Sequence, residues 1–146
     1  MPTFTMLNEI EASREECFDL SRSIDLHLES MIASKERAVA GVTSGLISMG
    51  EEVTWEARHL GLVWRITSRI TEFDRPRRFV DEMVRGPFAR FRHEHRFESQ
   101  GTGTLLIDLV EFAMPLGLLA NGPAGMYLRR LMRTRNATIR LRAESA

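Results

Sequence analysis

Residues Phe88–Glu98 read FARFRHEHRFE, and this stretch decides the fold. Its odd-numbered positions include Phe91, His93, His95 and Phe97, whereas its even-numbered positions from 90 onward are all charged. Because side chains alternate between the two faces of a strand, the pattern predicts a strand with one solvated face and one face turned to the core. Both histidines then point inward beside phenylalanines.

The next segment, Thr104 to Met114, places Asp108 on its own apolar face. A glycine-rich turn joins it to the histidine strand, so the two segments are predicted to pair as an antiparallel hairpin. If both apolar faces coincide, Asp108 must lie near His93 or His95. A buried polar group without a partner costs about 1 to 3 kcal/mol, and the sequence therefore predicts a contact between the carboxylate and an imidazole.

Helical signals flank a run of extended segments. Ser13 followed by Glu16 has the spacing of a capping box, which predicts a helix from about Arg14 and a second one after a break near 21–23. A last apolar stripe, starting at Pro123, predicts a long helix whose arginines from 129 to 142 are solvated. The predicted strands are 3–10, 36–43, 51–60, 62–73, 79–85, 88–98 and 104–114, and the facing of 79–85 is left open because its alternation is weak.

This order of elements predicts an α+β fold, in which a curved antiparallel sheet of about seven strands encloses an apolar pocket under the C-terminal helix. The length of 146 residues fits a single domain over 1–146. On the segment 51–60, alternation places Val53 and Trp55 on the inner face. On the segment 62–73, the inner face continues with Leu62, Trp64, Ile66 and Ile70.

Composition excludes several classes of function. Twenty Lys and Arg balance twenty Asp and Glu, so no overall field attracts nucleic acid or an anionic membrane. Cys17 is the single cysteine, which fits a core position in a cytoplasmic protein and removes the usual thiolate zinc site. No stretch approaches the roughly 18 apolar residues of a membrane span. No phosphate-cradling loop is present, and we expect no cofactor.

The cluster of His93, His95 and Asp108 has four interpretations. It fixes strand register as a satisfied structural cluster, or it orients the polar end of a ligand in an apolar pocket. It also has the residue types for general acid or base catalysis, although no nucleophile or oxyanion donor accompanies it. Two histidines with a carboxylate also resemble a metal site. A metal ion needs ligand atoms that converge on one point, which strand parity alone does not establish, and we expect no metal.

The chain resembles the START-like superfamily, also called the polyketide cyclase/dehydrase and lipid-transport group, and within it bacterial ligand-binding members of unassigned activity. The resemblance rests on the order of elements and on the stretches Met83–Phe88, Phe91–Phe97, Gly103–Thr104 with Asp108, and Pro115–Gly117. It implies a helix-grip fold with a cavity between the sheet and the last helix. The cavity positions that carry over are Trp55, Trp64, Ile66, Phe91, His93, His95, Asp108, Val110, Phe112, Leu128 and Met132.

What the resemblance implies for function is the binding of a small hydrophobic or amphipathic molecule. The alternative is a polyketide cyclase or dehydratase that uses one cavity histidine as general base, with His93, His95 and Asp108 as the candidates. We expect a small hydrophobic ligand as the partner, no nucleic acid, no integral membrane contact, and a monomer or weak homodimer. Fold-level analogy alone does not decide between binding and catalysis.

Overall fold

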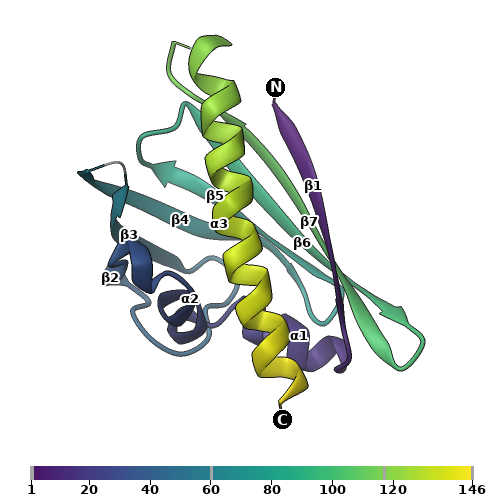
Figure 1. Ribbon diagram of the computed structural model, residues 1–146. Coiled ribbons are helices and arrows are strands. Elements are labelled where there is room, and N and C mark those ends of the chain that lie inside the picture. Colours follow the sequence, from purple (N-terminus) through teal and green to yellow (C-terminus); the bar gives the residue numbers. More distant parts are fainter. Residues whose placement is uncertain (1, 60, 117, 146) are drawn as a thin grey trace.

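The computed structural model describes residues 2–59, 61–116 and 118–145. Its sheet has seven strands, antiparallel throughout, in the order β1-β7-β6-β5-β4-β3-β2, and Figure 1 shows the long helix α3 lying across one face. The predicted α+β architecture is therefore confirmed. The elements are β1 (Thr3–Ile10), α1 (Arg14–Ser21), α2 (Ile24–Ser30), the 3-10 turn η1 (Ile32–Ser34), β2 (Arg37–Gly41), β3 (Glu52–His59), β4 (Leu62–Asp74), β5 (Arg78–Arg85), β6 (Arg90–Gln100), β7 (Gly103–Ala113) and α3 (Leu118–Glu144).

Serine caps divide the first helical region into the two predicted helices. The hydroxyl of Ser13 accepts a hydrogen bond from the backbone N–H of Glu16 at 3.2 Å, which starts α1. The hydroxyl of Ser23 accepts from the N–H of Leu26 at 3.1 Å, which starts α2. Each cap satisfies an amide that the first helical turn would otherwise leave unpaired, so a second helix begins after only two intervening residues.

Helix α3 begins earlier than the sequence predicts. The expected start was Pro123, but the helix starts at Leu118 and contains that proline. Proline's fixed φ suits a helix, and near the start its missing N–H removes only one intrahelical hydrogen bond. The side chain of Asn121 ties this first turn to the sheet, because its Oδ1 accepts the N–H of Met114 at 2.9 Å.

The β6–β7 hairpin has the register that parity predicts. Gln100 pairs with Gly103 across a two-residue turn, and five residues back along each strand His95 stands opposite Asp108. Gly103 also lies against β1, where a Cβ would come within 2.4 Å of the carbonyl oxygen of Ile10. Only glycine fits this approach, so the hairpin and β1 are held at a fixed separation.

Two apolar clusters fill the space between sheet and helices, and a polar layer separates them. The first contains Phe18 with Phe97, Leu106 and Ile139, and the second contains Phe4, Val110, Phe112, Leu128 and Met132. On β6, β7 and α3 alike, polar residues stand between the members of the two clusters: His93 and His95, Asp108, and Arg135 and Asn136. The polar residues of these three elements therefore form a single layer between the two apolar clusters.

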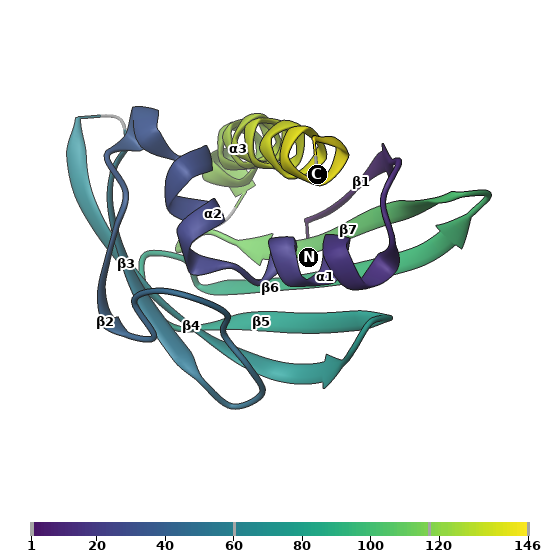
Figure 2. The same cartoon turned by 90° about the horizontal axis from the view of Figure 1, so that it is seen from below.

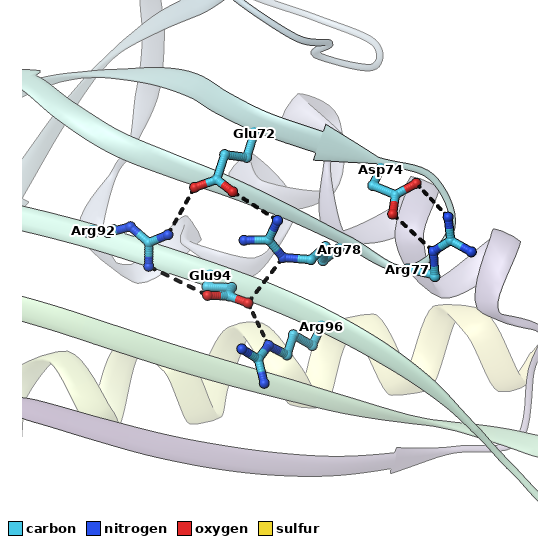
Figure 3. Close-up of polar contacts among 7 residues, drawn as sticks. All are labelled: Glu72, Asp74, Arg77, Arg78, Arg92, Glu94 and Arg96. Carbon is cyan, nitrogen blue, oxygen red and sulfur yellow. Dashed lines mark hydrogen bonds and ion pairs between the residues drawn. The ribbon is translucent and has the colours of Figure 1, made fainter.

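The outer face of the sheet is less open than the alternation predicts. Glu94 belongs to the charged face of β6, yet it is only 6% exposed. Figure 3 shows that Arg78 and Arg96 both donate to its carboxylate, with Arg92 at 3.5 Å on its other side. A second carboxylate, Glu72, accepts from Arg78 and Arg92. Long arginine side chains cover the glutamate, which explains how a residue on a solvated face becomes buried.

Helix α3 packs more closely against the edge strand β1 than against the rest of the sheet. Its backbone comes close to β1, α1 and α2, and approaches the other six strands less closely. Figure 2 shows α3 above the sheet with α2 beside it. On the inner face of β3 and β4, Trp55, Trp64 and Ile66 keep partial exposure, whereas Ile70 further along is buried. Leu62, which alternation also places inward, is 58% exposed because it lies at the tip of the β3–β4 hairpin.

Candidate functional site

His93 and Asp108 form the contact that the sequence predicts. Nε2 of His93 lies 2.7 Å from Oδ1 of Asp108, in the buried layer between the two apolar clusters. The other oxygen, Oδ2, accepts a hydrogen bond from Nδ2 of Asn136 on α3 at 2.8 Å. Because Asp108 is paired on both oxygens, its ionised form is satisfied, and Nε2 of His93 is the donor in their hydrogen bond.

His95 is held between a cation and a carboxylate. Nη2 of Arg135 lies 3.2 Å from Nδ1 of His95, and Oδ2 of Asp81 lies 2.7 Å from its Nε2. A guanidinium can only donate, so Nδ1 of His95 is the acceptor and its proton is on Nε2. The neutral imidazole thus passes a hydrogen bond from Arg135 to Asp81. Its ring also stacks on those of Phe79 and His93, with centroids 4.0 and 3.7 Å away.

The pKa shifts follow from this burial and pairing. Burial lowers the pKa of His95 well below that of a free histidine, and Arg135, together with His93 whenever it is protonated, lowers it further. Burial raises the pKa of Asp81. Burial acts in the same direction on Asp108, but the hydrogen bond from His93 and the nearby positive charges outweigh it and hold the pKa of Asp108 far below its ordinary value.

Sequence reasoning missed Asp81. The segment 79–85 alternates weakly, because Phe79 at 2% exposure and Val80 at 0% are both buried although they point to opposite faces. The pairing of β5 with β6 places Asp81 opposite His93 and Phe79 opposite His95. Asp81 therefore belongs to the inner face, and the covered outer face around Val80 is what hides that parity in the sequence.

The prediction that the arginines of 129–142 are all solvated is wrong for Arg135, which is 3% exposed. Nη1 of Arg135 donates to Oδ1 of Asn136 at 3.2 Å and lies 3.6 Å from Asp108, and Nη2 donates to the carbonyl of Ser21. A signal was available. Arg135 and Asn136 follow Met132 and precede Ile139 at helical spacing, so they occupy the apolar stripe that faces the sheet.

The remaining predicted positions divide between the two apolar clusters. Val110, Phe112, Leu128 and Met132 are buried together, and Phe91 packs against them. Trp55 packs against the other cluster, on the far side of the polar layer, and its ring lies tilted against that of His27 with centroids 4.0 Å apart. The predicted ligand-binding positions thus surround the polar layer rather than forming one continuous wall, and their role in binding stays a prediction.

One ligand atom each from Asp81, His93 and His95 lie within 4.8 Å of one another, a separation from which a metal ion could be bound. Two histidines and one carboxylate are also a recognised metal-binding set. A metal on Nε2 of His95 would however require a proton on Nδ1, where Arg135 donates. The contact with Arg135 therefore disfavours His95 as a ligand and favours it as a hydrogen-bond donor to Asp81.

A surface groove borders the polar layer at Asn136. It has a volume of about 470 Å³ and lies between β1 and α3. Asn136 reaches both regions, because it lines this groove and also donates to Asp108. The other residues that line the groove are Met6, Leu7, Asn8, Arg133, Ala137, Arg140, Leu141 and Glu144. Within the described ranges, none of the helices has the length and apolar character needed to cross a bilayer.

Comparison with solved structures reproduces the helix-grip architecture. The aromatase/cyclase Zhui from Streptomyces sp. R1128 is 12% identical, with a TM-score of 0.79 over 98% of this chain and 93% of that one. A START superfamily protein from Mycobacterium smegmatis is 15% identical, with a TM-score of 0.73 over 98% and 97%. The major latex-like protein 151 of Panax ginseng is 12% identical, with a TM-score of 0.70 over 97% of each chain. At these identities the likeness establishes the fold.

The sequence itself establishes the family. A search of curated proteins returned no match. Residues 1–144 match the family described as polyketide cyclase / dehydrase and lipid transport, which covers almost the whole chain and agrees with the helix-grip fold. The chain therefore belongs to the polyketide cyclase/dehydrase and lipid transport family.

Proposed function

We propose that the chain binds a small hydrophobic or amphipathic molecule between its sheet and α3. The observation that carries the proposal is the partial exposure of Trp55, Trp64 and Ile66 on the inner face of the sheet. Large apolar side chains that face inward are normally sealed by packing, and a ligand would complete that burial. Membership of a family with lipid-transport and cyclase members supports the same conclusion.

A larger side chain in the space between the sheet and α3 tests the proposal. Ile66→Trp places a larger side chain on the inner face, and Arg65→Trp places the same side chain on the outer face one residue earlier, where the arginine is 70% exposed. We expect native mass spectrometry of wild-type protein from its own host to show a retained small molecule. The molecule should persist in Arg65→Trp and be lost in Ile66→Trp. A wild-type protein that is reproducibly empty would contradict the proposal.

A dehydratase or cyclase is the second candidate, favoured by the placement of Asp81 and His93. Asp108 orients His93 through Nε2, and Nδ1 lies 4.0 Å from Oδ2 of Asp81. When Asp81 holds a proton, His93 can remove a proton from a carbon next to a carbonyl while Asp81 protonates the leaving hydroxyl. One C–H and one C–O bond break, a double bond forms and water leaves, after which the proton on His93 returns to Asp81.

Replacing His93 by Gln separates the two candidates, because Gln retains hydrogen bonding and cannot transfer a proton. On the binding proposal the retained molecule should still be found in His93→Gln. On the enzymatic proposal, turnover of a β-hydroxy ketone probe by wild-type protein should fall by at least a hundredfold in this variant. Wild-type protein that turns over no such probe would remove the second candidate and leave the first.

A further inference from the structure

The charges of the polar layer restrict where its protons are. Arg135 and the ionised Asp108 are 3.6 Å apart and neutralise each other. His95 is neutral, because it accepts from Arg135 on one nitrogen and donates to Asp81 from the other. Buried charge is stable only when it is compensated. Overall neutrality therefore requires Asp81 and His93 to hold one proton between them.

Two proton arrangements meet this requirement. Either Asp81 is a neutral carboxylic acid and His93 a neutral imidazole, or Asp81 is a carboxylate and His93 an imidazolium. In both arrangements one of the two facing groups donates a hydrogen bond and the other accepts one. Oδ2 of Asp81 and Nδ1 of His93 are 4.0 Å apart, which is too far for a direct hydrogen bond. Oδ2 already accepts from Nε2 of His95, and the carboxyl group keeps the capacity for a second hydrogen bond to a third group placed near Nδ1 of His93.

We propose that Asp81 and Nδ1 of His93 form the subsite that recognises a hydroxyl group on an otherwise apolar, uncharged ligand. This inference rests on the proposed binding function and names the polar group of the ligand. A hydroxyl donates one hydrogen bond and accepts another, so it matches the pair in either proton arrangement. A carboxylate or phosphate has no proton to donate and adds a negative charge to a balanced layer, and Arg135 already faces Asp108.

The exposure of the polar layer agrees with this assignment. The side chain of Asp81 is 20% exposed, whereas those of His93, His95, Asp108 and Arg135 are all at 5% or less. Asp81 is thus the member that a ligand would reach first.

Matched probes test the inference on the unaltered protein. We would measure binding by isothermal titration calorimetry at pH 7 for 2-naphthol, 2-fluoronaphthalene and 2-naphthoate, and for the corresponding anthracene set. The hydroxyl compound is expected to bind about tenfold more tightly than the fluoro compound, because one buried hydrogen bond distinguishes them. The carboxylate should bind most weakly. Equal affinity for hydroxyl and fluoro compounds, or preference for the carboxylate, would overturn the inference while leaving the proposed function intact.

Variants assign the preference to the subsite. In Asp81→Leu the ratio of hydroxyl to fluoro affinity should fall from about ten to about one. In Glu82→Leu, the next residue and on the opposite face of β5, the ratio should be unchanged. Both affinities in the ratio are measured on the same protein preparation. Partial unfolding of a variant lowers both equally and leaves the ratio unchanged. If no probe binds wild-type protein, the binding function itself fails, and this inference with it.

Discussion

Nε2 of His93 lies 2.7 Å from Oδ1 of Asp108, across the β6–β7 hairpin and in a layer that water barely reaches. This contact joins the sheet to α3, because Asn136 donates to the other oxygen of the same carboxylate. A polar layer of this kind specifies how three elements fit together, since a shift of any one would leave buried groups unpaired. In our proposal it also presents Asp81 and His93 to a ligand. The same groups can therefore serve structure and recognition.

Asp108→Asn should destabilise the protein by about 3 to 5 kcal/mol. The amide can accept from His93 on one side, but its NH₂ group then faces the NH₂ group of Asn136, and Arg135 is left without a compensating charge. The measurement is urea unfolding followed by circular dichroism. Asp74→Asn is the matched control, because Asp74 forms an exposed ion pair with Arg77, and it should cost less than about 1 kcal/mol. Similar costs for the two variants would contradict the account.

Arg135→Met should also destabilise the protein strongly, because it removes the buried cation that compensates the charge of Asp108. Arg130→Met on the exposed face should change stability by less than about 0.5 kcal/mol. The double variant Arg135→Met with Asp108→Leu removes both charges. Its loss of stability should be smaller than the sum of the two single losses by more than about 1 kcal/mol, measured as the coupling energy of a double-mutant cycle. Strict additivity would show that the two charges do not interact.

The sequence predicts the hairpin and its polar pair well for a physical reason. Strand alternation has a period of two, so the charged face of β6 shows that His93 and His95 point to the other face. The glycine-rich turn makes β7 pair back along β6, and parity then places Asp108 near one of the two histidines. Residues 88–98 therefore locate the inner face of the sheet, and together with the segment 104–114 they predict a contact of Asp108 with His93 or His95.

The rest of the site depends on tertiary packing that local patterns do not encode. Asp81 is hidden because arginine side chains cover the outer face near Val80 and Glu94, which makes both faces of the sheet apolar or buried there. Arg135 is hidden because a charged residue on a helix is normally solvated. Its helical spacing from Met132 and Ile139 carries the information, but only once a carboxylate opposite it is known.

Glu94→Gln should destabilise the protein by about 1 to 3 kcal/mol, more than a surface ion pair would. The side chain is 7% exposed, and Arg78 and Arg96 donate to the same oxygen, so the neutral amide loses charge-assisted hydrogen bonds and leaves the guanidinium groups under-compensated (Figure 3). Glu111→Gln is the control, because Glu111 pairs with Arg90 at an exposed site. Thermal unfolding of both variants checks the difference. Equal shifts would mean that burial of Glu94 adds nothing.

Acid should destabilise the protein from about pH 6.5 downward through His95. Burial depresses the pKa of this imidazole in the folded state, so between its unfolded pKa near 6.5 and its lower folded pKa the unfolded chain binds one more proton than the native chain. Stability contributed by His95 is then fully present above about pH 6.5 and is lost as pH falls towards the folded pKa. The slope reaches at most about 1.4 kcal/mol per pH unit.

Asp81 opposes this trend at lower pH, because its raised pKa means that the native state holds a proton that the unfolded state has released. The contribution of Asp81 is present below the ordinary aspartate pKa near 4 and is lost as pH rises through its folded pKa. The two effects are separable by denaturant titration between pH 4 and 8. His95→Gln keeps a donor towards Asp81 and cannot titrate, so its stability should fall less steeply than that of wild type below pH 6.5. In Asp81→Asn the opposing contribution disappears, and the fall should be steeper than in wild type. A wild-type slope in His95→Gln would show that the acid sensitivity lies outside the polar layer.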